Sequence, residues 1–191
     1  VDGEDETFTP IHLVTARPTI TNNTISLSAK GAVSADPDSF SDSRGRIGPD
    51  IHGNNVTGNT TNALVIRSDS GASKLTAAAR FDDTDIVHVI TDNLQIEGAP
   101  GGQQDPSNPN RAVTAGRLAI DAGVIVKLSS ARIEAERGGA QLIAEGTPIN
   151  PVIFTSLLDD RYGAGGTFDT TGNLGTVQPS PGDWAGLVFN M

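Results

Sequence analysis

A short motif occurs twice in this chain, in the pattern P-x-I-x-x-N-x-[I/V]. The segment PTITNNTI begins at Pro18, and the segment PDIHGNNV begins 31 residues later, at Pro49. The shared positions are Pro18 and Pro49, Ile20 and Ile51, Asn23 and Asn54, and Ile25 and Val56. An asparagine between short aliphatic strands suits strands stacked about 4.8 Å apart, because each Asn can hydrogen-bond its counterpart in the next layer. We therefore expect an Asn23–Asn54 ladder; two unrelated Asn-rich turns are the alternative.

Short strands separated by turns are densest from residue 117 onward. Apolar residues alternate there in brief runs, bounded by Gly, Asn, Asp and Pro, which is the pattern of strands and turns. The alternating positions are Leu118 and Ile120, Val124, Val126 and Leu128, Ile133 and Ala135, Leu142 and Ala144, and Val152 and Phe154. This spacing also suits a β-sandwich, so the repeat is what favours stacked strands.

Helix signals are nearly absent. The best candidate is residues 71–81, GASKLTAAARF, whose alanines favour a helical turn or two. Residues 98–116 and 159–182 are rich in Gly, Pro, Asn and Asp, and we expect two long loops there. Residues 68–97 fit either an insertion or a further set of strands. We expect residues 1–191 to form a single domain or a fragment of a longer one. An N-terminal segment would span residues 1–17, Asn-rich strands 18–97, the most regular strands 117–158, and a further strand would begin in 183–191.

Composition excludes several classes of protein. The chain has 6 Phe, 1 Tyr and 1 Trp, so its core must consist of narrow aliphatic layers. The formal charge of −10 argues against nucleic-acid binding, which needs a basic surface. With no cysteine, disulfides and thiolate metal sites are excluded, and no apolar run approaches the ~20 residues of a membrane span. The beginning, VDGEDETF, suits either a boundary of the expressed segment or a processed piece of a larger secreted protein.

Three segments resemble a known family. They are PDIHGNNVTGNTTNALVIRS, the segment from Gly116 to Asp160, and PGDWAGLVFN. They look like coils of the right-handed parallel β-helix found in very large secreted or surface proteins of bacteria, planctomycetes among them. The matching positions are Gly116, Leu118, Ile120 and Gly123; Leu142, Ala144, Gly146 and Thr147; Pro151, Val152, Phe154, Thr155 and Ser156; and Gly182, Asp183, Trp184, Gly186 and Leu187. The resemblance implies an all-β solenoid, with Trp184 as an anchor against a neighbouring coil. It implies little about activity, because this fold carries lyases, adhesins and inert stalks.

Aspartates are the main candidates for chemistry. Carboxylates can bind Ca²⁺ through six to eight oxygens, and paired carboxylates can cleave glycosidic bonds. The Ca²⁺ candidates are Asp82, Asp83, Asp85, Asp159 and Asp160, with Asp169 and Asp183 nearby in sequence. The alternative is that these residues cap turns and make the surface acidic. No EF-hand loop, calcium-binding nonapeptide repeat or hydrolase motif is present, so no catalytic residue and no organic cofactor is predicted.

Lysine, histidine and asparagine side chains are weaker candidates. Lys127 alternates out of VIVKLSS, so we expect it on an exterior strand face, as a solubility residue. His88 shares a face with Ile86 and Ile90, which predicts a partly buried, hydrogen-bonded histidine. Sequons at Asn22, Asn55 and Asn59 are candidate glycosylation sites.

Two functions from different classes remain. The first is an extracellular structural or adhesive module of a bacterial cell surface or filament. Its partners would be copies of itself, the remainder of a longer chain, or cell-surface polysaccharide, since a β-helix with open ends exposes strand edges. The second is a carbohydrate-binding or polysaccharide-cleaving domain. The scarcity of aromatic residues for sugar stacking favours the first.

Overall fold

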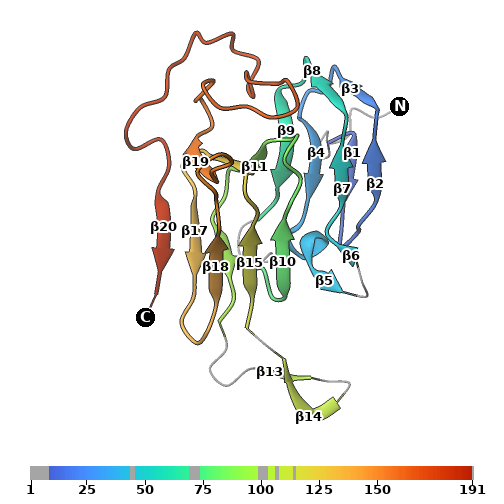
Figure 1. Ribbon diagram of the computed structural model, residues 1–191, viewed down its shortest axis with the longest axis vertical. Helices are drawn as coiled ribbons and strands as arrows, with labels where there is room; N and C mark the ends of the chain where they lie inside the picture. Colours follow the sequence, from blue (N-terminus) through green and yellow to red (C-terminus); the bar gives the residue numbers. More distant parts are fainter. Residues whose placement is uncertain are drawn as a thin grey trace, which may run out of the picture.

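The computed structural model describes residues 9–43, 46–68, 74–98, 103–105, 108–113 and 115–190. These residues form an all-β structure without α-helix, and one short 3-10 helix, η1 (Pro37–Phe40), begins at the N-cap Asp36 (Figure 1). No helix among the described residues is long and apolar enough to cross a membrane.

The largest sheet among the described residues has six strands, all parallel, and its strands follow one another across the upper half of Figure 1. Its strand order is β1 (Ile11–Leu13), β4 (Gly31–Ala35), β9 (Thr61–Ile66), β11 (His88–Ile90), β16 (Ile125–Leu128) and β19 (Ile153–Ser156). The strands of this sheet lie in the order in which they occur along the chain, although strands of other sheets lie between them in sequence. Because neighbouring strands are parallel and no hairpin can join parallel strands, each connection must leave this sheet and return to it.

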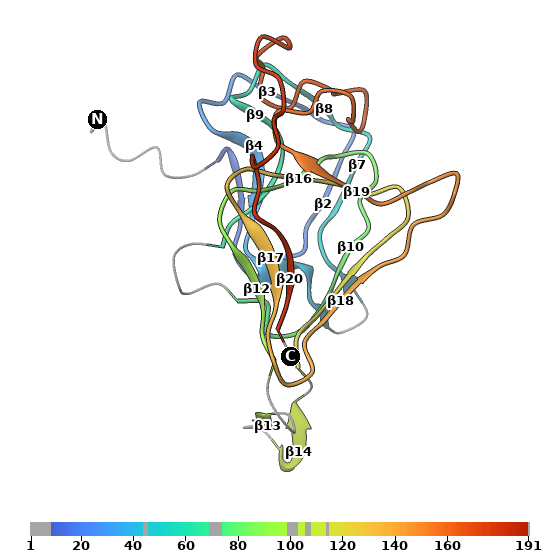
Figure 2. The same cartoon turned by 90° about the vertical axis from the view of Figure 1, so that its left-hand side faces the viewer.

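The connections carry the other parallel strands (Figures 1 and 2). One three-stranded sheet contains β10 (Ala78–Phe81), β15 (Arg117–Ile120) and β18 (Gln141–Ala144). A second contains β12 (Leu94–Ile96), β17 (Arg132–Ala135) and β20 (Gly186–Phe189). Nearer the N-terminus, β2 (Thr19–Thr21) pairs with β7 (Asp50–His52), and β3 (Thr24–Ser26) pairs with β8 (Asn55–Thr57).

Alternate side chains of the six-stranded sheet point to opposite faces. The register aligns one row through Ile11, Val33, Leu64, His88, Val126 and Phe154. This row belongs to the main core, which also takes Ile51, Phe81, Ile96 and Leu118 from the other strands. The row beside it, which includes Val65, Val89 and Lys127, faces away from that core. Stacked rows of mainly aliphatic side chains therefore fill the core, which needs few aromatic residues.

The repeat and the strand predictions are confirmed. Ile20 pairs with Ile51 and Ile25 with Val56, which are the aliphatic positions of the two motif copies. The strands expected after residue 117 are β15, β16, β17, β18 and β19, and the further strand expected in 183–191 is β20. The all-β prediction and the parallel arrangement of strands are thus both present in the structure.

Three predictions need correction. The helix expected within residues 71–81 is wrong, because Ala78–Phe81 form β10; residues 71–73 lie outside the described part. Pairing with β15 and burial of Ala79 and Phe81 outweigh the helix propensity of alanine. Residues 68–97 are no insertion where described, since β11 lies between β9 and β16. The expected loop 98–116 contains an antiparallel pair, β13 (Gln103–Asp105) and β14 (Asn108–Val113).

A second antiparallel pair, β5 (Asp42–Ser43) and β6 (Arg46–Ile47), follows η1.

Candidate functional site

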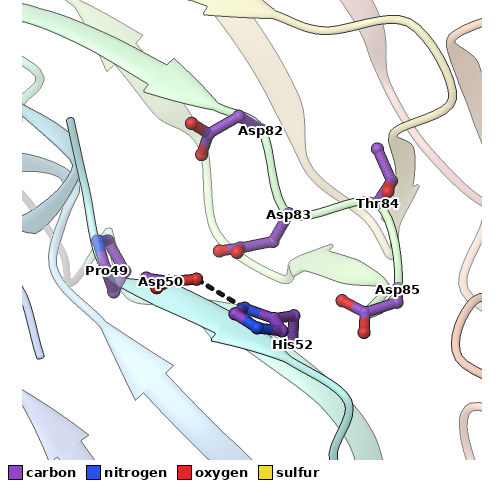
Figure 3. A pocket seen from close by; sticks show the side chains of 7 residues that line it. All are labelled: Pro49, Asp50, His52, Asp82, Asp83, Thr84 and Asp85. Carbon is purple, nitrogen blue, oxygen red and sulfur yellow. Dashed lines mark hydrogen bonds and ion pairs between the residues drawn. The ribbon is translucent and has the colours of Figure 1, made fainter. Parts of the chain in front are cut away.

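An acidic hollow of about 650 Å³ lies beside β7 (Figure 3). Pro49, Asp50 and His52 line it from β7 and the residue before that strand. The turn after β10 supplies the opposite side, with Asp82, Asp83, Thr84 and Asp85. The structure therefore brings together the three aspartates of the FDDTD segment, which the sequence predicts as Ca²⁺ ligands, and adds Asp50 and His52.

Two of these aspartates cap the edge of β7. Asp83 Oδ1 accepts the backbone N–H of Ile51 at 2.9 Å, and Asp85 Oδ2 accepts that of Gly53 at 2.6 Å. Residues two apart on a strand point their N–H groups to the same side, and the other side of β7 pairs with β2. The side chains of a D-x-D turn thus replace the carbonyl groups that a further strand would offer.

Burial controls the electrostatics of the hollow. Asp83 is 8% exposed, and burial raises its pKa to about 7, helped by Asp82, Asp50 and Asp85 and opposed by the Ile51 N–H. Burial also raises the pKa of Asp82, with Asp121 adding to the effect. His52 Nδ1 lies 2.6 Å from Asp50 Oδ1, and both side chains are about half exposed. The hollow thus combines a carboxyl group that exchanges its proton near neutral pH with an exposed imidazole.

The geometry gives no support to the calcium prediction. Among the described residues, no group of three His, Asp or Glu side chains is arranged to hold a metal ion. Asp83 and Asp85 each direct one oxygen to a backbone N–H, as described above. The assignment of Ca²⁺ to Asp82, Asp83 and Asp85 therefore stays a prediction.

The remaining carboxylate candidates belong to the segment after β19. Asp159 is fully buried, and Arg161 holds its pKa well below the ordinary value through bonds of 2.8 and 2.9 Å. The adjacent Asp160 has a buried Oδ1 without a hydrogen-bond partner in the described part of the chain, and burial raises its pKa. Asp169 accepts the N–H groups of Asn173 and Leu174. Asp183 accepts from the Ser156 hydroxyl at 2.7 Å. These contacts shape the loop rather than gather oxygens around an ion.

Residues 159–182 form the expected long loop, and it folds back over the outer face of the six-stranded sheet (Figure 1). Ala164 of this loop packs with Ala63, Val87, Val89 and Ile125 in a second apolar cluster, separate from the main core. Gly165 adopts φ +58°, and a Cβ there would collide with the backbone of Asp85, so this position requires glycine. Residues 159–182 thus pack against the strands and do not extend freely from them.

Lys127 corrects a sequence prediction. It lies in the outward row, as expected, but its side chain is 0% exposed because the loop covers it. Its Nζ donates to the Thr170 hydroxyl at 2.8 Å and to the Phe168 carbonyl at 3.3 Å. Burial lowers its pKa, against the attraction of Asp160, Asp159 and Asp169. Alternation identified its face correctly, but nothing in the sequence pattern indicated that a loop 40 residues later would cover that face.

His88 is more deeply buried than expected. It is 0% exposed and stacks on Phe81, with ring centroids 4.7 Å apart and an interplanar angle of 25°. Among the residues that the structure describes, neither ring nitrogen has a partner with hydrogen-bond geometry, so the predicted hydrogen bond is not found there. Burial lowers the pKa of His88 to about 3, and the backbone of Ile86 acts in the opposite direction. The imidazole ring of His88 is therefore part of the buried core.

The three sequons differ in accessibility. Asn22 and Asn55 are exposed, so both amides are available to a modifying enzyme. Asn59 is 3% exposed, and its Nδ2 donates to the Ile25 carbonyl at 2.9 Å. Its Oδ1 accepts the Ser28 N–H at 2.9 Å, so the folded protein does not offer Asn59 to a glycan. The predicted glycosylation site at Asn59 is therefore corrected. Its side chain joins neighbouring layers, as the side chain of Asn54 does.

Trp184 packs against the main core, as the resemblance implies for an anchor. Comparison with known proteins adds no assignment: no family model, no curated protein and no solved structure matches this chain.

Proposed function

We propose that this chain is a right-handed parallel β-helix that serves as a structural or adhesive module of an extracellular bacterial assembly. The parallel strands support this proposal, because successive segments of the chain lie in register in the same three stacks. The resemblance of residues 116–160 to coils of secreted and surface proteins agrees with it. A long, rigid stack of strands is suited to spacing and display rather than to enclosing a substrate.

One observation carries the proposal. At the end of the structure that faces the viewer in Figure 2, β18, β19 and β20 are the last strands of their three sheets. Among the described residues, nothing pairs with their outer edges. The apolar side chains of this layer are only partly buried: Leu142, Val152, Phe154, Trp184 and Leu187. Open strand edges next to partly exposed apolar residues are a site for adding another strand.

The contrast with β7 and β8 strengthens the argument. Asp83 and Asp85 cap the edge of β7, and Thr167 of the loop donates to the carbonyl of Val56 in β8. These contacts therefore block strand addition there, and no contact among the described residues blocks it at β18, β19 and β20. We propose that β1 of a second copy pairs with β19, because these are the two edge strands of one parallel sheet. Such a head-to-tail contact does not close, so it would build a filament.

Sedimentation velocity over a wide range of protein concentration, together with negative-stain electron microscopy, tests this proposal. We expect concentration-dependent growth into linear particles. Phe154→Lys places a charge in the open layer and should abolish the growth, whereas Val177→Lys, at an exposed loop position, should not. Folded particles that stay monomeric at every concentration would contradict it, as would equal assembly by both variants. A repeat with a chelator reports whether Ca²⁺ contributes.

A second candidate function is polysaccharide cleavage at the acidic hollow. It is favoured by Asp83, whose pKa is raised to about 7, opposite the exposed His52–Asp50 pair. A carboxyl group that is half protonated at neutral pH suits a general acid. Release of reducing ends or unsaturated products from polysaccharides, lost in Asp83→Asn, would support this candidate; no product from neutral or acidic polysaccharides would remove it.

A further inference from the structure

A second hollow, of about 680 Å³, lies between β8 and the docked loop. Asn55 and Thr57 of β8 line one side, and Phe168, Asp169 and Leu174 of the loop line the other. We call it the loop groove. It is distinct from the acidic hollow, since the two share no lining residue.

The loop side of the groove is held in place by several hydrogen bonds. Thr167 Oγ1 donates to the Val56 carbonyl at 2.9 Å, and Asn62 N–H donates to the Thr170 carbonyl at 2.7 Å. Asn62 Nδ2 donates to the Asp169 carbonyl at 3.2 Å, and Lys127 Nζ reaches the carbonyl of Phe168. Residues 167–170 are thus fixed to three different strands. A segment so firmly held presents its side chains in one arrangement, which lowers the entropy cost of binding.

Phe168 is not buried by this docking. Its side chain is 54% exposed, and Leu174 on the same wall is 88% exposed, although Ala164 of the loop is buried. In a chain with only 6 Phe, an aromatic ring left at the rim of a groove by a rigidly held backbone is not explained by core packing. An apolar face of this kind suits the C–H surface of a flat ligand.

The opposite wall offers unused polar groups. Among the described residues, the side chains of Asn55 and Thr57 make no hydrogen bond, and both are exposed. They continue an outward row on β3, where Thr24 pairs with Asn55 and Ser26 with Thr57. An amide and several hydroxyl groups at strand spacing can donate and accept hydrogen bonds without carrying charge.

We propose that the loop groove binds a neutral saccharide, with a sugar ring on Phe168 and its hydroxyl groups on Asn55 and Thr57. A saccharide combines an apolar ring face with hydroxyl groups, which matches an aromatic wall facing an amide and a hydroxyl. A neutral one is favoured because the chain carries a net charge of −10, which repels polyanions. Each carboxylate oxygen of Asp169 already accepts a backbone N–H, so this side chain holds the loop in place rather than standing free in the groove.

This inference gives the adhesive part of the proposed function a ligand, and it rests on that part alone. Its test is affinity gel electrophoresis of the full chain, made in a host without N-glycosylation, because a glycan on Asn55 would occupy the groove. The gels contain dextran, a β-1,3-glucan, a galactomannan or, for comparison, acidic alginate. We expect the protein to be retarded in at least one gel that contains a neutral polysaccharide. We expect no retardation in the alginate gel. Filament formation is scored separately by sedimentation, so the two proposals fail independently.

Variants then place the binding in the groove. Phe168→Ala should weaken the retardation by about two- to tenfold, because it removes the stacking surface. Thr57→Val, which keeps the shape and removes the hydroxyl, should weaken it as well. Tyr162→Ala is the matched control, since Tyr162 is an exposed aromatic residue of the same loop that does not line the groove. Absence of retardation in every neutral gel, retardation in alginate alone, or equal effects of Phe168→Ala and Tyr162→Ala would overturn the proposal.

Discussion

Asn54 Oδ1 accepts the backbone N–H of Asn23 at 3.0 Å and the Nδ2 of the same residue at 3.2 Å. Asn54 Nδ2 in turn donates to the Ile20 carbonyl at 2.6 Å. One side chain thus joins two layers at the bend between β7 and β8. Without it, polar backbone groups at this bend would lose their partners.

Asn54→Ala should therefore destabilise the protein by about 1 to 2 kcal/mol, since it removes an acceptor and a donor together. Asn55→Ala is the control, because that neighbouring side chain makes no hydrogen bond among the described residues. Urea denaturation followed by circular dichroism measures both. Equal stability of the two variants would show that the asparagine contact contributes nothing.

Asp83 should make stability fall as the pH rises. Its pKa is raised from 3.8 to about 7, so between these values the folded protein keeps a proton that the unfolded chain has lost. The free energy of unfolding then decreases from pH 4 to pH 7, by up to roughly 4 kcal/mol. Asp83→Asn, whose amide oxygen can still accept the Ile51 N–H, should abolish this slope and be more stable than the wild type at pH 8. Parallel pH profiles of the two proteins in urea denaturation would contradict the prediction.

His88 should act in the opposite sense. Its pKa is lowered from 6.5 to about 3, so the unfolded chain binds a proton first as the pH falls. Its contribution to stability is complete above pH 6.5 and is lost toward pH 3. We expect His88→Phe to be less sensitive to acid, with His88→Leu as a second variant in case the larger ring does not fit. Urea denaturation from pH 3 to pH 7 in the Asp83→Asn background isolates the effect. An unchanged acid slope in both variants would contradict it.

Lys127 should control the docking of the loop. Lys127→Met keeps most of the side-chain length but loses the bonds to Thr170 and Phe168. We expect faster amide hydrogen exchange in residues 162–175 with little change in β16 or β17. Because a buried charge is removed, the free energy of unfolding should change by less than about 2 kcal/mol. Lys74→Met, which breaks a surface ion pair with Glu136, is the control. Uniformly faster exchange throughout the chain would instead indicate general destabilisation.

The fold was predictable where the pattern is local. Alternation located β15 to β19, because each strand buries every second side chain against a neighbour of the same kind. The 31-residue repeat predicted the pairing of Ile20 with Ile51 and the contact of Asn23 with Asn54. The helix expected within 71–81 was wrong because the helix propensity of its alanines applies to the isolated segment, whereas in the folded protein β15 supplies a partner strand.

The sites were less predictable because they depend on contacts between distant segments. Asp83 caps Ile51 from 32 residues away, close to the repeat length, so the repeat contained a signal for this contact. The burial of Lys127 and the partial exposure of Phe168 depend on where the loop docks. No periodicity describes a loop, and its docked position follows from glycine geometry and single hydrogen bonds.

The loop that docks on β8 is synthesised long after β8 itself. Thr167 covers Val56 across 111 residues of chain, and Asp169 accepts from Asn62 across 107. At about 5 to 20 residues per second, a ribosome needs roughly 5 to 20 s to make the covering segment after β8 has emerged. During this interval the edge of β8 is open to any other strand nearby. The nascent chain is therefore most vulnerable to mispairing in the interval before residues 167–170 are made.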